Sequence, residues 1–259
     1  MANLKNYNDF LKLFVIFLTL SLIASCSTKS FSVTKIEGKL IPITGKENQN
    51  TQIESFITPY RERINSDLDK VLAYNPETLE KSKGKWQTNI GNFISDVTLS
   101  RGNTVFNKRE NKNIDICLLN HGGIRSILPK GNITSRTAYE IMPFENTLFV
   151  VSLKGEQVKE LADFFIADKK PHPLSGLTFS IDKNNQAKNI LVQGKPLDTD
   201  KIYYVATNDY LINGGDNMAF FQKGIQKFDL EYKLRNVLID YFIETDTVTV
   251  KNDIRILAE

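Results

Sequence analysis

The sequence predicts an α+β fold in which helices pack against a mixed β-sheet, and three observations support this prediction. Beyond residue 113, short apolar runs typical of strands alternate with segments whose apolar residues recur every three or four positions, as in helices. Glycine and proline mark the turns without forming a long linker. The 259 residues, 41% hydrophobic and 24% charged, are enough to bury a sizeable core. We therefore expect one folded domain after the amino-terminal segment.

Residues 1–25 are predicted to be a lipoprotein signal peptide. Two lysines precede an apolar run over 13–23, which is shorter than the roughly 20 residues that a membrane-spanning helix needs. The run ends in Ala24-Ser25-Cys26, which resembles the lipobox of bacterial lipoproteins. That resemblance implies cleavage before Cys26, lipidation of its thiol and a membrane-anchored protein on the periplasmic or cell-surface side. The alternative is an ordinary signal peptide with an incidental cysteine.

The folded domain is expected over residues 55–259, after an anchor, tether and first strand or strands over 26–54. Apolar residues alternate over 31–43, which suggests a strand or two. Three- and four-residue spacing predicts an amphipathic helix over 53–71 and a second helix over 88–99.

The remaining elements follow in order along the chain. Strands are predicted at 114–119, 147–153, 176–181, 188–193, 202–207 and 253–258. Helices are predicted at 135–142, at 156–168 and from Leu230 to Phe242. Cys117 falls within the first of these strands and is expected to act as a small core residue.

Charge and histidine content exclude two classes of function. The formal net charge of +3 is too small to predict binding to nucleic acid. The two histidines, His121 and His172, and the two cysteines form no CxxC or HxxxH pattern, so a dinuclear metal centre is not expected in this chain, and neither is a cofactor. We expect His121 at the rim of a pocket or in solvent, and His172, between two prolines, in an exposed loop.

Two glycine-rich loops, over 118–125 and 206–216, each follow an apolar strand. Paired glycines allow the backbone to come close to a ligand, and loops at strand ends are where α/β sheets tend to bind ligands. A plain Gly-Gly turn is the alternative interpretation of each loop taken alone.

Three ordered motifs carry a resemblance to a known family. They are Asn120-x-Gly122-Gly123-Ile124-Arg125, Pro143-Phe144-x-Asn146-Thr147-Leu148, and Thr207-Asn208-Asp209-Tyr210-Leu211-x-x-Gly214-Gly215-Asp216. Their order and spacing resemble the carboxy-terminal domain of the 5'-nucleotidase family, over roughly residues 55–258. The resemblance implies a fold like that domain and a substrate-binding set of Asn120, Gly122, Gly123, Arg125, Phe144, Tyr210 and Asp216.

The resemblance also implies a role for each polar or aromatic member of that set. Phe144 and Tyr210 match two aromatic residues that sandwich the nucleobase, and Asn120 matches one that hydrogen-bonds the base. Arg125 matches a contact near the phosphate, and Asp216 an acceptor for the ribose hydroxyls. The alternatives are that the two rings are core residues, Arg125 a surface ion pair, and Asn120 and Asp216 turn-stabilising side chains.

The sequence departs from the family pattern at two places near this site. Where relatives commonly carry an arginine before the first helix, this chain has Trp86 and Gln87, with Lys83 and Lys85 nearby, so the phosphate contact is expected to be weaker or to come from a lysine. Glu145 stands where a glycine is frequent and is expected to add negative charge near the phosphate.

The largest departure concerns catalysis. The metal-binding motifs of the family's amino-terminal metallophosphoesterase domain do not occur in this sequence. We therefore expect the nucleotide-binding half of a split 5'-nucleotidase in nucleotide catabolism, inactive alone, with divalent metals held by a separate metallophosphatase chain. The main alternative is a non-enzymatic lipoprotein that binds nucleotides or nucleosides. A hydrolase built on Ser126, or on two carboxylates, is a third class.

Overall fold

The computed structural model describes residues 4–23, 31–42 and 50–258, and the chain divides into two compact units, Met1–Thr51 and Gln52–Glu259. The first unit contains α1 (Leu4–Ile23). No helix in the described parts of the chain is both long and apolar enough to cross a membrane. Cys26, the predicted lipidation site, lies outside the described residues.

The strand predicted over 31–43 is not present in its described part, residues 31–42, where every residue is exposed and has no regular secondary structure. Alternation of apolar residues favours a strand only where a neighbouring strand supplies the hydrogen bonds, because even an isolated strand pair is marginally stable in water.

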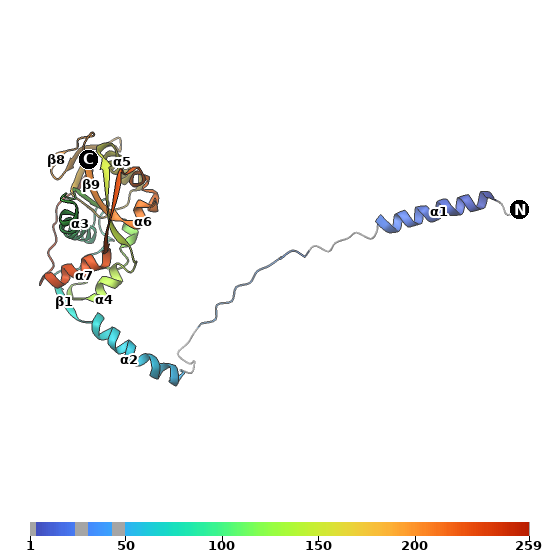
Figure 1. The fold of residues 1–259 in the computed structure, drawn as a ribbon, viewed down its shortest axis with the longest axis horizontal. Helices are drawn as coiled ribbons and strands as arrows, with labels where there is room; N and C mark the ends of the chain where they lie inside the picture. Colours follow the sequence, from blue (N-terminus) through green and yellow to red (C-terminus); the bar gives the residue numbers. More distant parts are fainter. Residues whose placement is uncertain (1–3, 24–30, 43–49, 259) are drawn as a thin grey trace. The chain divides into compact units, whose positions relative to one another are not determined.

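A mixed five-stranded sheet forms the centre of the second unit (Figure 1). Its strands, in the order in which they pair, are β10 (Gln226–Lys233), β4 (Thr147–Lys154), β9 (Ile202–Asn208), β2 (Ile116–Leu118) and β5 (Leu174–Ser175). The strand β9 is antiparallel to β4 and parallel to β2, which confirms the predicted mixed sheet.

Two smaller sheets complete the strand pairing. One has the order β11 (Ile256–Ala258), β6 (Leu177–Ile181), β7 (Ala187–Val192) and β8 (Lys195–Pro196). The other pairs β1 (Val71–Asn75) with β3 (Gly131–Thr134).

Helices cover both faces of the central sheet. The six helices described in the second unit are α2 (Thr51–Leu68), α3 (Asn89–Glu110), α4 (Ser135–Ile141), α5 (Gly155–Asp168), α6 (Asp209–Ile212) and α7 (Leu234–Glu244). Residues of α3 and α7 share one hydrophobic cluster with Cys117 of β2, whereas residues of α5 share another with Ile116 and Leu118. Successive residues of a strand point to opposite faces, so β2 contributes to both clusters. Cys117 is fully buried, as predicted, and burial raises the pKa of its thiol.

The last predicted helix starts too early. Leu230 lies in β10, which pairs with β4, and α7 begins only at Leu234. Leu230 and the buried apolar residues of α7 join the same hydrophobic cluster, which is why their spacing resembles one helical face. The amphipathic helix predicted over 53–71 forms as α2, but none of its residues is buried.

Candidate functional site

The three sequence motifs meet at one edge of the central sheet because of strand direction. The parallel pair aligns Cys117 of β2 with Ala206 of β9, so the loops that follow both strands leave from the same edge. The antiparallel pair aligns Leu148 with Asn208, which places the start of β4 at that edge too. Residues about a hundred positions apart are thereby brought together.

These loops enclose a cavity of about 260 Å³, lined by Asn120, Gly122, Phe144, Asn146, Tyr210 and Asp216. Five of the seven predicted site residues are in this lining; Gly123 and Arg125 are not. The ring-bearing residues Phe144 and Tyr210 are 47% and 46% exposed, so the alternative that they are core residues is wrong. Asn146 also lines the cavity and lies inside the second motif, but no role was predicted for it.

Hydrogen bonds and a glycine turn hold the ring of Tyr210. The Tyr210 hydroxyl donates to Oδ1 of Asp216 at 2.9 Å, and the Asp216 backbone N–H donates back to that hydroxyl at 3.3 Å. A Cβ at Gly215 would lie 2.5 Å from Cε1 of Tyr210, so only glycine lets the turn pass this close to the ring. The Asp216 side chain therefore helps to hold the Tyr210 ring in place.

Asn120 is held by a second amide. It is 8% exposed, and its Oδ1 accepts from Nδ2 of Asn208 at 3.3 Å. Asn208 in turn caps α6, because its Oδ1 accepts from the Leu211 N–H at 2.9 Å. With Oδ1 of Asn120 engaged, its Nδ2 group remains as a donor at the cavity wall.

The prediction that His172 is exposed is wrong. The ring is 2% exposed, its Nδ1 accepts from the His121 backbone N–H at 3.1 Å, and its Nε2 lies 2.8 Å from an oxygen of Asp168. Burial lowers the pKa of His172, against the attraction of Asp168. The flanking prolines thus place His172 behind the Asn120–Gly123 turn as an anchor. The His121 ring is half-buried, and its Nδ1 lies 3.3 Å from the Pro171 carbonyl oxygen.

Two cations without an acidic partner lie beside the cavity. The Arg125 guanidinium lies 5.9 Å from the centre of the Phe144 ring and donates to the Gly122 carbonyl at 3.4 Å. The Lys81 ammonium donates to the Ile124 carbonyl at 2.6 Å, and burial together with the nearby Arg125 charge lowers the pKa of Lys81. Within residues 50–258, no carboxylate lies within ion-pair distance of either cation.

The lysines singled out in the sequence have other contacts. Lys83 pairs with Glu80 at 2.6 Å, and the ammonium of Lys85 lies 5.2 Å from the centre of the Trp86 ring. Lys81, by contrast, is close enough to Arg125 for that charge to lower its pKa. Its position five residues before Trp86 and six before Gln87 was the only sequence signal for it.

The negative charge expected from Glu145 is balanced by a neighbouring cation. Its carboxylate pairs with Arg235, and this ion pair lowers the pKa of Glu145. Arg235 is 6% exposed and comes from the first turn of α7. No local pattern could have identified it, because 90 residues separate the two partners.

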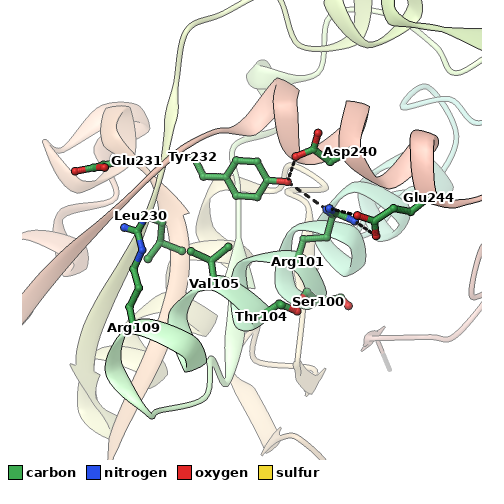
Figure 2. A pocket seen from close by; sticks show the side chains of 10 residues that line it. All are labelled: Ser100, Arg101, Thr104, Val105, Arg109, Leu230, Glu231, Tyr232, Asp240 and Glu244. Carbon is green, nitrogen blue, oxygen red and sulfur yellow. Dashed lines mark hydrogen bonds and ion pairs between the residues drawn. The ribbon is translucent and has the colours of Figure 1, made fainter.

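A larger cavity of about 540 Å³ lies elsewhere, between α3, β10 and α7 (Figure 2). In this groove, Arg101 donates to both carboxylate oxygens of Glu244, at 2.7 and 2.9 Å, and to the Tyr232 hydroxyl at 3.2 Å. That hydroxyl donates to Asp240 at 2.6 Å. Four of the groove's polar side chains thus bond one another. In the described residues, no group of three or more His, Cys, Asp or Glu side chains is arranged to hold a metal ion.

Comparison with known proteins gives the family. A family model described as 5'-nucleotidase, C-terminal domain, matches residues 70–223. The chain belongs to this family. The match and the mixed α+β architecture confirm the fold class predicted from the sequence.

Relatives of this 5'-nucleotidase C-terminal domain are much longer proteins. The trifunctional nucleotide phosphoesterase protein YfkN of Bacillus subtilis is 26% identical over 224 residues, which cover 80% of this chain and 14% of that protein. The protein UshA of Yersinia enterocolitica is 26% identical over 175 residues, covering 65% and 30%. The crystal structure of a 5'-nucleotidase precursor from Thermus thermophilus superposes with a TM-score of 0.67 at 25% identity, covering 80% and 43%. The chain therefore spans less than half the length of each.

Proposed function

We propose that the cavity at the sheet edge binds a nucleotide through its base. The observation that carries this proposal is that two half-exposed rings, Phe144 and Tyr210, come from separate motifs and line the same cavity. A nucleobase offers a π face to each ring. Stacking on one ring contributes about 1 to 3 kcal/mol whichever base is bound.

The polar groups around the rings suit the rest of a nucleotide. Oδ1 of Asp216 accepts from Tyr210, which leaves its second oxygen to accept from a ribose hydroxyl. Arg125 and Lys81 lack acidic partners among the described residues and suit a phosphate group as its counter-charges. Asn120 and Asn146 supply amide groups to the wall of the cavity.

The chain is proposed to act as the substrate-recognition half of a split 5'-nucleotidase. The full-length relatives are described by name as nucleotidases and phosphoesterases, and this chain spans only part of their length. The sequence lacks their metal-binding motifs, so the proposal assigns the activated water to a separate metallophosphatase chain. The apolar run ending at Cys26 supports placing both chains on the outer side of a membrane through a lipid anchor.

Calorimetric titration of the purified chain with adenosine, AMP and UMP tests the binding proposal. We expect all three to bind, with AMP tighter than adenosine. A chain that binds none of them at millimolar concentration contradicts the proposal.

Phosphate release separates the two functional alternatives. The chain is assayed with AMP, alone and with a metallophosphatase encoded beside it in the genome. Stimulation of AMP hydrolysis only by the pair supports the split enzyme. Binding without any stimulation supports the nucleotide-binding lipoprotein instead.

The lipid anchor has its own test. Replacing Cys26 with Ser should move the protein from the membrane fraction to the soluble fraction, and unchanged retention would contradict lipidation.

A further inference from the structure

The loop that carries Phe144 joins α4 to β4 and spans residues 142–146. A half-exposed ring on a short loop loses conformational freedom when it stacks on a ligand, and this cost falls if the loop is already fixed. The contacts of the loop therefore bear directly on how the cavity binds.

The first turn of α7, together with Lys233 just before it, fixes this loop from behind. Nη1 of Arg235 donates to the Pro143 carbonyl at 3.3 Å, and Nη2 pairs with the Glu145 carboxylate. Nζ of Lys233 donates to the Glu145 carbonyl at 2.7 Å. The Leu234 N–H donates to the Asn146 carbonyl at 3.0 Å. Both residues that flank Phe144 are thus hydrogen-bonded, while the ring itself stays half-exposed.

Arg235 is itself held firmly in place. Its side chain is 7% exposed, and its guanidinium lies 4.0 Å from the centre of the Tyr139 ring on α4. A guanidinium is planar and rigid, so it can bond a carbonyl and a carboxylate at the same time, which a lysine cannot do with the same geometry. It therefore ties α4, α7 and the Phe144 loop together.

We propose that Arg235 is a positioning residue that, through Glu145 and the Pro143 carbonyl, holds the Phe144 ring ready to receive a nucleobase. The inference rests on the proposed nucleotide-binding function. It also gives Glu145 a role as the exposed half of its ion pair with Arg235.

The test uses Glu145→Gln, because Glu145 is 68% exposed, and ion pairs made by exposed carboxylates contribute little to stability. We expect the melting temperature to stay close to that of the wild type. Affinity for adenosine should fall about three- to tenfold, since apparent affinity scales with the fraction of molecules in the binding-competent conformation. Adenosine is uncharged, so loss of the Glu145 charge has no direct electrostatic effect on it.

The matched control is Glu244→Gln in the groove of Figure 2. Glu244 is 66% exposed and pairs with Arg101, which also contacts a tyrosine, so the same kind of interaction is removed far from Phe144. We expect adenosine affinity to remain unchanged. A loss of affinity equal to that of Glu145→Gln would overturn the proposal.

A double-mutant cycle distinguishes positioning from a general structural effect. In a Phe144→Ala background, Glu145→Gln should have no further effect on adenosine affinity, because the ring that it positions is absent. The buried Arg235 is probed by Arg235→Lys, with a melting curve beside each titration. Wild-type affinity in Glu145→Gln, or a Glu145→Gln loss that persists without Phe144, overturns the proposal. A wild-type chain that does not bind adenosine instead refutes the proposed function.

Discussion

The cavity at the sheet edge and the groove between α3, β10 and α7 use their polar groups in opposite ways. In the groove, the side chains of Arg101, Glu244, Tyr232 and Asp240 bond one another (Figure 2). In the cavity, Asn120 and Tyr210 are anchored by Asn208 and Asp216, and both rings remain half-exposed.

The difference teaches that volume is a poor guide to a binding site. The groove is about 540 Å³ and the cavity about 260 Å³, yet a ligand entering the groove would have to break existing bonds. A polar group lost from its partner costs about 1 to 3 kcal/mol when it stays buried. A ligand entering the cavity meets aromatic rings and hydrogen-bond donors. The hydrogen bonds that hold these groups lie on the side away from the ligand and need not break. The following predictions test this comparison.

The largest effect is expected from removing both rings. The double variant Phe144→Ala, Tyr210→Ala should lose measurable binding of adenosine and AMP alike, since each stacking contact is worth about 1 to 3 kcal/mol and does not depend on the phosphate. Calorimetric titration measures the loss. Tyr232→Ala, which removes the ring of the groove, should leave binding unchanged. A stable double variant that binds like the wild type would falsify the stacking model.

Two glycine substitutions are expected to separate binding from stability. Gly215→Ala places a Cβ 2.5 Å from the exposed Tyr210 ring, which can move aside, so affinity should fall about tenfold while stability changes little. Gly224→Ala places a Cβ 2.2 Å from Cγ1 of buried Val151, so it should cost about 1 to 3 kcal/mol of stability and leave affinity intact in the folded protein. Melting curves and adenosine titrations of both variants measure stability and affinity. A variant in which stability and affinity fall together would contradict this separation.

The two cations beside the cavity, Lys81 and Arg125, should strengthen binding of the phosphate only. Lys81→Gln and Arg125→Ala are each expected to weaken AMP binding by about 1 kcal/mol and to leave adenosine binding unchanged, because the phosphate carries the charge that they meet. Titrations at low and high salt measure the difference, which should shrink as salt screens it. Lys83→Gln is the control, since Lys83 already pairs with Glu80. Equal losses for AMP and adenosine would rule out a phosphate contact.

The smallest effects concern pH. His172 beside the cavity should lower the free energy of unfolding in acid, and Tyr232 in the groove should lower it in alkali. Burial lowers the pKa of His172 below its ordinary value of 6.5, although Asp168 and Asp216 favour its protonated form. As the pH falls, His172 therefore binds a proton in the unfolded chain before it does so in the folded chain. The free energy of unfolding should decrease below about pH 6.5, by no more than about 1.4 kcal/mol per pH unit. Thermal unfolding between pH 8 and 5 measures this slope, and His172→Gln should flatten it.

Tyr232 in the groove should instead lower the stability of the protein in alkali. Burial and the hydrogen bond to Asp240 raise the pKa of Tyr232 to about 12. The folded chain keeps this proton after the unfolded chain has lost it, so the free energy of unfolding should fall as the pH rises from about 10 towards 12. Unfolding curves over that range should show a smaller fall in Tyr232→Phe, and identical curves would argue against this assignment.

The sequence by itself determined the fold class, the order of most helices and strands, and five of the cavity-lining residues. Periodicity records which side of an element is buried, and Gly-Gly turns with nearby polar and aromatic residues mark loops that can approach a ligand. Local pattern failed where the decisive partner was distant. The alternating stretch over 31–42 pairs with no strand in the described part of the chain, and Leu230 continues the spacing of α7 although it belongs to β10.

Only the tertiary structure decided how the site is supported. Strand directions place the three motifs at one edge, and His172 becomes a buried anchor because the chain folds it behind the Gly-Gly turn. Arg235 reaches Glu145 across 90 residues and balances the charge expected there. Hydrogen bonds and ion pairs act over a few ångströms in space, whereas sequence patterns report only on neighbours along the chain. Most residues that line the cavity could therefore be predicted, and the residues that hold them in place could not.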